Sequence, residues 1–203
     1  MIKIIDNFLP DPYSVRRESF KSKISDNYLT HPGTRKIIPT HIKNLVLTLL
    51  KKELNEDIRI DEGGFDFIDE KYVTGIPHAD SGKEGGYGGF KYAAVMYLNP
   101  NPPENTGIEI YDYAADNKHL YFYTTEADYL KEGFFASKKN FIDRFIWKNF
   151  IVKRCIKELK NKIEISIKFN RMVIFDSDRI HRPQNYFGTS DKNCRLSMVF
   201  FLK

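Results

Sequence analysis

The stretch Ile76-Pro77-His78-Ala79-Asp80 places an imidazole and a carboxylate one residue apart. If residues 72–80 are extended, their side chains alternate between two faces, so His78 and Asp80 project to the same side. A third ligand must come from elsewhere, and His181, in the stretch Ile180-His181-Arg182-Pro183, is the best candidate. Two histidines and one carboxylate on one face of an octahedron leave three positions open, an arrangement that suits non-haem Fe(II).

Several other residues compete for these ligand positions. Asp176 and Asp178 are the carboxylates closest to His181 in sequence, but they sit in a turn after a predicted strand, where aspartate is common as a local cap. We therefore rank them behind Asp80. The remaining histidines are expected to be surface or packing residues: His31, His41 and His119. An isolated His-x-Asp pair is more often structural than metal-binding, so the metal hypothesis depends on all three ligands together.

The length and composition of the chain indicate one globular domain over residues 1–203. Of these residues 41% are apolar and 14% are aromatic, which is ample for a sizeable core. No apolar run approaches the ~20 residues that span a bilayer, and the first residues lack the layout of a signal peptide. We therefore expect a cytoplasmic protein without a membrane partner.

The cysteine content and the charge add little to this assignment. Cys155 and Cys194 are too few for a disulfide framework, so free and mostly buried thiols are expected. The formal net charge of +5 would fit an acidic or nucleic-acid partner, but the lysines are spread along the chain rather than gathered in one block.

Sequence signals near the start of the chain predict two helices. Asp11 followed by Pro12 supplies an N-cap and a proline at the first helical position, so a helix is expected from there to about Lys23. Thr40 is expected to cap a second helix, which carries apolar residues at helical spacing and ends at Asn55.

Alternating or continuous apolar runs predict the strands. They are expected over residues 2–5, 58–61, 65–68, 71–77, 92–98, 108–113, 163–169, 172–176 and 195–202. At least eight short strands with two early helices fit a mainly β fold. We expect a double-stranded β-helix (jelly roll) with both helices packed on one sheet.

Two stretches stand apart from this pattern. Residues 81–89 are rich in glycine but lack the spacing of a phosphate-binding loop, so we interpret them as a loop beside the metal. Residues 114–165 are an insertion in which Ser137 is expected to cap a long helix, with a break near Asn149 as one option. Apolar residues recur there at helical spacing: Phe141, Ile142, Phe145, Ile146, Ile151, Cys155 and Leu159. This insertion either packs outside the sheet or acts as a lid.

The chain carries a series of short motifs in a fixed order. They are Asp6-Asn7-Phe8-Leu9-Pro10, His78-Ala79-Asp80, Val95-Met96-Tyr97-Leu98-Asn99 followed by Gly107, Asn170-Arg171-Met172-Val173-Ile174-Phe175-Asp176, His181, and Arg195-Leu196-Ser197. This series resembles the Fe(II)/2-oxoglutarate-dependent dioxygenases, in particular the prolyl-4-hydroxylase-like branch and its bacterial and phage relatives.

The resemblance implies a set of cofactors and the residues that bind them. His78, Asp80 and His181 would hold Fe(II), with 2-oxoglutarate and O2 as co-substrates. Arg195 would meet the far carboxylate of 2-oxoglutarate with two parallel hydrogen bonds, because a guanidinium is a planar fork. Ser197, on the same face of the strand, would donate a further hydrogen bond.

Two tyrosines and two more arginines are further candidates for contacts with the co-substrate or the substrate. Tyr97 matches a landmark of the family and is a candidate co-substrate contact, although core packing is the default for both Tyr97 and Tyr92. Arg171 and Arg182 flank the distal histidine, and each could bind an acidic substrate or be solvated. The implied reaction is hydroxylation of a C–H bond in a small-molecule or peptidyl substrate, with formation of succinate and CO2.

Three rival functions are considered. The first is a cupin-like jelly-roll metal-binding protein without oxygenase activity, which would have no use for Arg195. The second is a nucleic-acid demethylase of the same superfamily. Those enzymes typically carry a second arginine six residues after the co-substrate arginine, where this chain has Phe201, so a nucleic-acid partner is not expected. The third is a structural module that binds no metal.

Overall fold

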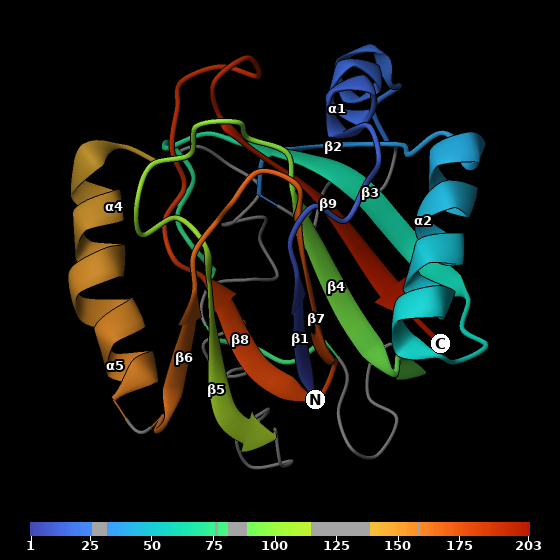
Figure 1. Cartoon of the computed structure of the whole chain (residues 1–203). Helices are drawn as coiled ribbons and strands as arrows, with labels where there is room; N and C mark the ends of the chain where they lie inside the picture. Colours follow the sequence, from blue (N-terminus) through green and yellow to red (C-terminus); the bar gives the residue numbers. More distant parts are fainter. Residues whose placement is uncertain (26–31, 76, 81–88, 115–138, 158) are drawn as a thin grey trace.

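The computed structural model describes residues 1–25, 32–75, 77–80, 89–114, 139–157 and 159–203. The described part is mainly β, with antiparallel strands in two sheets (Figure 1). One sheet has the strand order β1-β7-β4-β9-β3-β2, and the other has the order β6-β5-β8. The strands are β1 (Ile2–Ile5), β2 (Thr34–Lys36), β3 (Ile60–Ile68), β4 (Tyr92–Tyr97), β5 (Ile108–Ala114), β6 (Lys162–Ile165), β7 (Arg171–Asp176), β8 (Arg179–Pro183) and β9 (Arg195–Leu202). The prediction of a mainly β chain is confirmed.

Two helices cover one face of the larger sheet. Helices α1 (Pro12–Lys21) and α2 (Thr40–Leu54) lie on the same side of it in Figure 1. Val46 and Leu50 of α2 are fully buried in one cluster with Phe65 of β3. Their helical spacing faces the alternate, inward-pointing residues of the strands, so burial of this apolar surface fixes the helices against the sheet.

The N-termini of these two helices are capped differently. The carboxylate of Asp11 accepts a hydrogen bond from the backbone N–H of Ser14 at 2.9 Å, as an N-cap should. The predicted Thr40 cap is wrong, because Pro39 occupies the N-cap position and Thr40 is already the first helical residue. Helix α2 ends where expected, since Asn55 adopts the left-handed conformation at φ 53°.

The opposite face of the larger sheet packs against the smaller sheet. Val95 of β4, together with Val173 and Phe175 of β7, is buried there with Ile108 and Ile110 of β5. Residues along a strand alternate between faces, so this sandwiched layer receives every second side chain of the central strands. The candidate functional residues described below lie in the same layer.

The predicted strand over residues 71–77 is wrong. The chain turns at Asp69, whose carboxylate accepts the backbone N–H of Lys71 at 2.9 Å. Pro77 then removes a donor that a strand ladder would need. The segment therefore approaches the site as irregular chain, with a single β-bridge at His78.

Other strand boundaries also differ from expectation. The predicted runs 58–61 and 65–68 merge into one strand, β3, which begins at Ile60, and the run 163–169 shortens to β6. Strands β2 and β8 were not predicted. Both are short, and each forms because a neighbouring strand offers hydrogen-bonding groups, a tertiary effect that the local pattern does not carry.

Part of the predicted insertion forms a continuous helix without a break at Asn149. It consists of α4 (Phe141–Ile146), a π-helical segment η4 (Trp147–Val152) and α5 (Lys153–Ile156). Ser137 and the rest of residues 115–138 lie outside the described residues, and Asn140 is the N-cap. None of the helices in the described part of the chain combines the length and apolar character needed to cross a membrane.

The buried side of this helix differs from the predicted one. Trp147 and Val152 are buried, whereas most of the predicted apolar face is exposed, with Phe141 74% exposed. Each π turn holds more residues than an α turn, so the buried stripe shifts along the sequence. At its end, Ile156 packs against Tyr111 and Ile180 of the smaller sheet.

Gly107, just before the central strand β5 of the smaller sheet, lies close to the ends of both neighbouring strands, β6 and β8. The Gly107 N–H donates to the Gln184 side-chain oxygen at 2.9 Å, and its carbonyl accepts the Gln184 N–H at 3.1 Å. A Cβ atom at this position would lie 1.9 Å from the backbone oxygen of Ile165.

We expect Gly107→Ala to lower the free energy of unfolding by about 2 kcal/mol or more, because the backbone must move to make room for the added Cβ atom. Urea unfolding of the variant measures this, and an unchanged midpoint would contradict it.

Candidate metal centre

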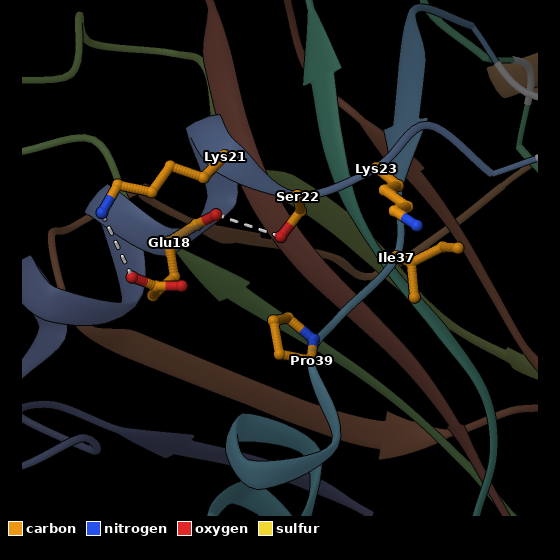
Figure 2. Close-up of a pocket in the computed structure, with 6 residues that line it drawn as sticks. All are labelled: Glu18, Lys21, Ser22, Lys23, Ile37 and Pro39. Carbon is orange, nitrogen blue, oxygen red and sulfur yellow. Dashed lines mark hydrogen bonds and ion pairs between the residues drawn. The ribbon is translucent and has the colours of Figure 1, made fainter.

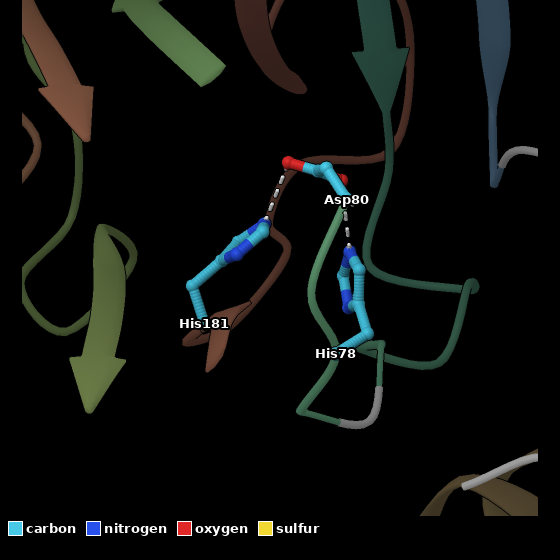
Figure 3. Close-up of side chains that lie close together, drawn as sticks. All are labelled: His78, Asp80 and His181. Carbon is cyan, nitrogen blue, oxygen red and sulfur yellow. Dashed lines mark ion pairs between the residues drawn. The ribbon is translucent and has the colours of Figure 1, made fainter. Parts of the chain in front are cut away.

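The three predicted ligands His78, Asp80 and His181 come together in the structure (Figure 3). One ligand atom from each lies within 4.8 Å of the other two. Asp80 Oδ1 is 3.7 Å from His78 Nε2, and Asp80 Oδ2 is 3.4 Å from His181 Nε2. The carboxylate thus lies between the two imidazoles, and the three donors can converge on one ion.

Backbone hydrogen bonds hold the ligands in place. The His78 N–H donates to the His181 carbonyl at 3.0 Å, and the His181 N–H donates to the His78 carbonyl at 2.8 Å. The Asp80 N–H donates to the Ser177 carbonyl at 2.9 Å. His181 belongs to β8, so the irregular segment that carries the other two ligands is anchored directly to a strand.

His181 is prepared for metal binding by its surroundings. Its Nδ1 lies 3.0 Å from the carbonyl oxygen of Arg179, which favours the tautomer with the proton on Nδ1 and leaves the Nε2 lone pair toward Asp80. Burial lowers the pKa of His181 to about 4, and Asp80 opposes this only in part. The imidazole is therefore neutral at pH 7, as a metal ligand must be.

The pKa of His181 predicts how the stability of the metal-free chain depends on pH. In the folded chain the imidazole takes up its proton near pH 4, against about 6.5 for an unperturbed histidine. Between these values the unfolded chain binds more protons, so stability falls as the pH drops, by about 3 kcal/mol over the whole window. Urea unfolding at pH 7 and pH 4.5 measures the difference. His181→Asn should reduce it, and an equally steep dependence in that variant would contradict the assignment.

Arg195, Ser197 and Tyr97 lie together on the inner face of the larger sheet. Tyr97 and Ser197 are cross-strand partners, and the Arg195 Cζ atom lies 5.4 Å from the centre of the Tyr97 ring. Within the described residues, Tyr97 Oη, Ser197 Oγ and Arg195 Nε are buried and find no hydrogen-bond partner. An unpaired buried polar group costs about 1–3 kcal/mol, so three of them in one place indicate a site for a polar ligand.

Tyr186 completes this group and was not predicted. The centre of its ring lies 5.8 Å from Arg195 Cζ, so two tyrosine rings lie close to the guanidinium. Burial raises the pKa of Tyr186 to about 12, and the phenol stays neutral. Tyr186 lies in the connection between β8 and β9, where the sequence shows no periodic pattern that would single it out.

The competing carboxylates and histidines do not join the metal group. Among the described residues, His78, Asp80 and His181 are the one set that could share an ion. Asp176 instead pairs with Arg179 at 3.7 Å, and Asp178 is not part of the set. His41 is exposed on α2, and His31 and His119 lie outside the described residues.

Both arginines that flank the distal histidine already hold carboxylates. Arg171 Nε donates to Asp6 at 2.7 Å, and this hydrogen bond lowers the pKa of Asp6. Arg182 forms a buried pair with Glu109, with Nε and Oε2 2.7 Å apart. Arg171 thus forms an exposed ion pair and Arg182 a buried one, so each guanidinium already has a carboxylate partner within the chain.

Cys194 is a free and buried thiol, as predicted. Burial raises its pKa to about 12, so it is not a nucleophile at neutral pH. The side chain of Cys155 lies outside what the structure describes.

Nearly the whole sequence matches one known protein family. Over residues 1–202 the sequence matches the family described as "Family of unknown function (DUF6445)". The chain belongs to the DUF6445 family. A comparison with curated proteins finds no match.

Solved structures reveal what this DUF6445 chain is similar to. HygX from Streptomyces hygroscopicus, with nickel, 2-oxoglutarate and hygromycin B bound, is 12% identical with a TM-score of 0.57, covering 99% of this chain and 82% of that one. A prolyl hydroxylase from Trichoplax adhaerens, in complex with a peptide fragment, is 13% identical with a TM-score of 0.58 and covers 98% and 82%. A prolyl-4-hydroxylase from Pseudomonas putida is 14% identical with a TM-score of 0.54 and covers 100% and 91%. The predicted resemblance to 2-oxoglutarate/Fe(II) oxygenases is thus confirmed at the level of the fold.

A buried ion pair between Arg35 and Asp66 was also missed from the sequence of this DUF6445 member. Arg35 lies in β2, which was not predicted, and Asp66 lies in β3 between two phenylalanines. The signal that could have revealed this ion pair is Asp66 itself, a charged residue at an inward position of a buried strand. Phe65 and Phe67 face the helices, so Asp66 must face the metal layer.

Two surface hollows lie outside the metal centre. The first, of about 270 Å³, lies between the end of α1 and the chain after β2, and an ion pair of Lys21 and Glu18 lies at its edge (Figure 2). The second is a groove of about 380 Å³ between α4 and the chain before His78, with Tyr186 in its wall. Only the second groove adjoins the candidate site.

Proposed function

We propose that the chain is an Fe(II)- and 2-oxoglutarate-dependent oxygenase that hydroxylates a C–H bond of a small-molecule or peptidyl substrate. The observation that carries this proposal is a His-Asp-His group that could share one ion, together with three buried, unpartnered polar atoms at Arg195, Ser197 and Tyr97 that face the same layer between the two sheets. We further propose that residues 1–203 form one double-stranded β-helix (jelly-roll) domain, which the two packed sheets support.

The donor set fits the proposed metal. His78, Asp80 and His181 would hold Fe(II) through two imidazole nitrogens and one carboxylate oxygen, which leaves positions for further ligands. Bound Fe(II) would supply O2 activation, which couples oxidative decarboxylation of 2-oxoglutarate to substrate hydroxylation. Because Asp80 provides a carboxylate ligand, no vacancy for a halide arises, and hydroxylation is favoured over halogenation.

The second group of residues fits the far carboxylate of 2-oxoglutarate. Arg195 is buried with an unpaired Nε, and a carboxylate would supply the missing acceptor and the compensating charge. Tyr97 and Ser197 carry hydroxyl groups on the adjacent strand positions and would donate further hydrogen bonds. The rings of Tyr97 and Tyr186 exclude water from the guanidinium, which strengthens this ion pairing.

The fold relatives support the cofactors and the breadth of substrates. HygX is seen with nickel and 2-oxoglutarate, and with hygromycin B, while the Trichoplax enzyme is seen with a peptide. The groove beside α4 reaches Tyr186 and the chain leading to His78, so we propose that substrate is bound along it. The helix at 141–156 would then form one wall of the substrate site, as the lid hypothesis for 114–165 expects.

The test is formation of succinate from 2-oxoglutarate by the purified chain, followed by NMR. We expect succinate to form only with Fe(II) and O2 both present. If the protein is instead a metal-binding jelly-roll protein without oxygenase activity, it will bind Fe(II) and 2-oxoglutarate but form no succinate. A chain that takes up no Fe(II) or Mn(II) would contradict both functions.

A further inference from the structure

A row of polar side chains crosses the inner face of the larger sheet. Arg35 of β2 pairs in register with Asp66 of β3, Asp66 with Ser197 of β9, and Ser197 with Tyr97 of β4. The last two belong to the proposed co-substrate group. Arg35 stands two strand spacings from Ser197, about 10 Å across the sheet.

Asp66 holds the Arg35 guanidinium by one edge and leaves another edge unused. Arg35 Nε donates to Asp66 Oδ1 at 2.6 Å, and Nη2 donates to Oδ2 at 2.7 Å. A guanidinium has five N–H donors, so three are left, both on Nη1 and one on Nη2. Within the described part of the chain no acceptor meets Nη1. The Nη1 and Nη2 hydrogens that remain side by side form an end-on fork of the shape that binds an oxyanion.

The sequence around the pair makes room for this arginine. A Cβ atom at Gly64 would lie 2.7 Å from Arg35 Cγ and 2.8 Å from Cδ. The stem of Arg35 therefore runs across the bare backbone of β3 before it reaches Asp66. A glycine inside a strand weakens that strand. The need to accommodate the Arg35 side chain explains why glycine nevertheless occupies position 64.

Stability alone is a poor reason for this pair. The Arg35 and Asp66 side chains are only 11% and 8% exposed, and two buried charges cost as much to desolvate as their attraction returns. Replacing a buried ion pair by apolar residues of similar volume is often neutral or stabilising. Burial by itself would lower the pKa of Arg35, but Asp66 raises it, and Asp80 of the metal group contributes in the same direction. The guanidinium is thus charged and within the electrostatic reach of the metal centre.

We propose that the free fork of Arg35 binds an oxyanion, a carboxylate or phosphate, carried by the substrate. This proposal rests on the proposed oxygenase function and narrows its substrate class. Asp66 orients the fork and compensates its charge before substrate arrives, and Gly64 keeps its path open. Arg195 remains assigned to 2-oxoglutarate.

The test measures binding of trifluoroacetate and its neutral isostere trifluoroacetamide by 19F NMR. The chain of residues 1–203 is loaded with Zn(II) and excess 2-oxoglutarate, so that Arg195 is occupied. We expect trifluoroacetate to bind about tenfold more tightly than trifluoroacetamide. The double variant Arg35→Met/Asp66→Leu, which keeps the volume of the pair, should abolish this preference, and Gly64→Ala should weaken it. Arg59→Met, which removes an exposed arginine just before β3, should leave it unchanged.

Two results would overturn the proposal. One is equal binding of the two probes by the unmodified chain, and the other is a preference for trifluoroacetate that survives in Arg35→Met/Asp66→Leu. Binding of 2-oxoglutarate is followed in the same samples by 1H NMR. If 2-oxoglutarate fails to bind while Arg35 still discriminates the probes, the oxyanion site stands and the proposed oxygenase function fails.

Discussion

Replacing Asp80 with alanine is expected to lower the affinity for Fe(II) by more than about 100-fold, because loss of a direct ligand exceeds the 10–100-fold effect of losing a residue that only supports one. Formation of succinate should fall with it to background. Asp80 is the only carboxylate in the described group, and its two oxygens face both imidazoles, so no neighbouring residue can replace it.

Asp178→Ala is the matched control for this experiment. Asp178 is the carboxylate that the sequence ranked as an alternative ligand, and the structure leaves it out of the group. Its replacement should leave Fe(II) binding, measured by titration under anaerobic conditions, within about twofold of the unmodified chain. If Asp178→Ala loses the metal while Asp80→Ala retains it, the ligand assignment is wrong.

Replacing Arg195 with methionine is expected to weaken 2-oxoglutarate binding by about 100-fold or more, since two charge-assisted hydrogen bonds are lost. Fe(II) binding should persist because Arg195 is not a ligand. In the unmodified chain, 2-oxoglutarate at 100 times its dissociation constant should stabilise the fold by about 2.7 kcal/mol, and this stabilisation should disappear in the variant. Thermal unfolding with and without 2-oxoglutarate measures both.

Arg17→Met removes an exposed arginine of α1 and is the control for loss of positive charge. It should keep the full stabilisation by 2-oxoglutarate. Equal effects of Arg195→Met and Arg17→Met would mean that net charge, rather than the buried guanidinium, attracts the co-substrate. Unchanged stabilisation in Arg195→Met would remove Arg195 from the site.

Much of the fold and the centre of the site could be predicted from sequence because their signals are local. The Asp11 cap, the apolar spacing of α2 and the alternation in β4 and β9 each depend on neighbouring residues in the chain. The three predicted ligands also lie close enough together to share one ion. Here a specific order of motifs, rather than any single His-x-Asp, supplied the information.

The structural features that could not be predicted from the sequence depend on contacts between distant segments of the chain. β2 and β8 exist because β3 and β5 present open edges to them, and the stretch before His78 is irregular because a turn at Asp69 and Pro77 override its apolar pattern. The ion pair of Arg35 with Asp66 is also a product of strand pairing, since only the register of β2 on β3 brings the two residues together. No window of sequence contains both.

The reciprocal hydrogen bonds between His78 and His181 have a consequence for the order of folding. Residues so far apart in the chain can meet only after long loops have closed, so the ligand set assembles late and the unfolded chain offers no equivalent chelate. A metal ion that binds at that stage stabilises the native state but not the folding transition state. It would therefore leave the rate of refolding almost unchanged and slow the rate of unfolding. Persistence of the loaded protein would then be set by how long the ion remains in place.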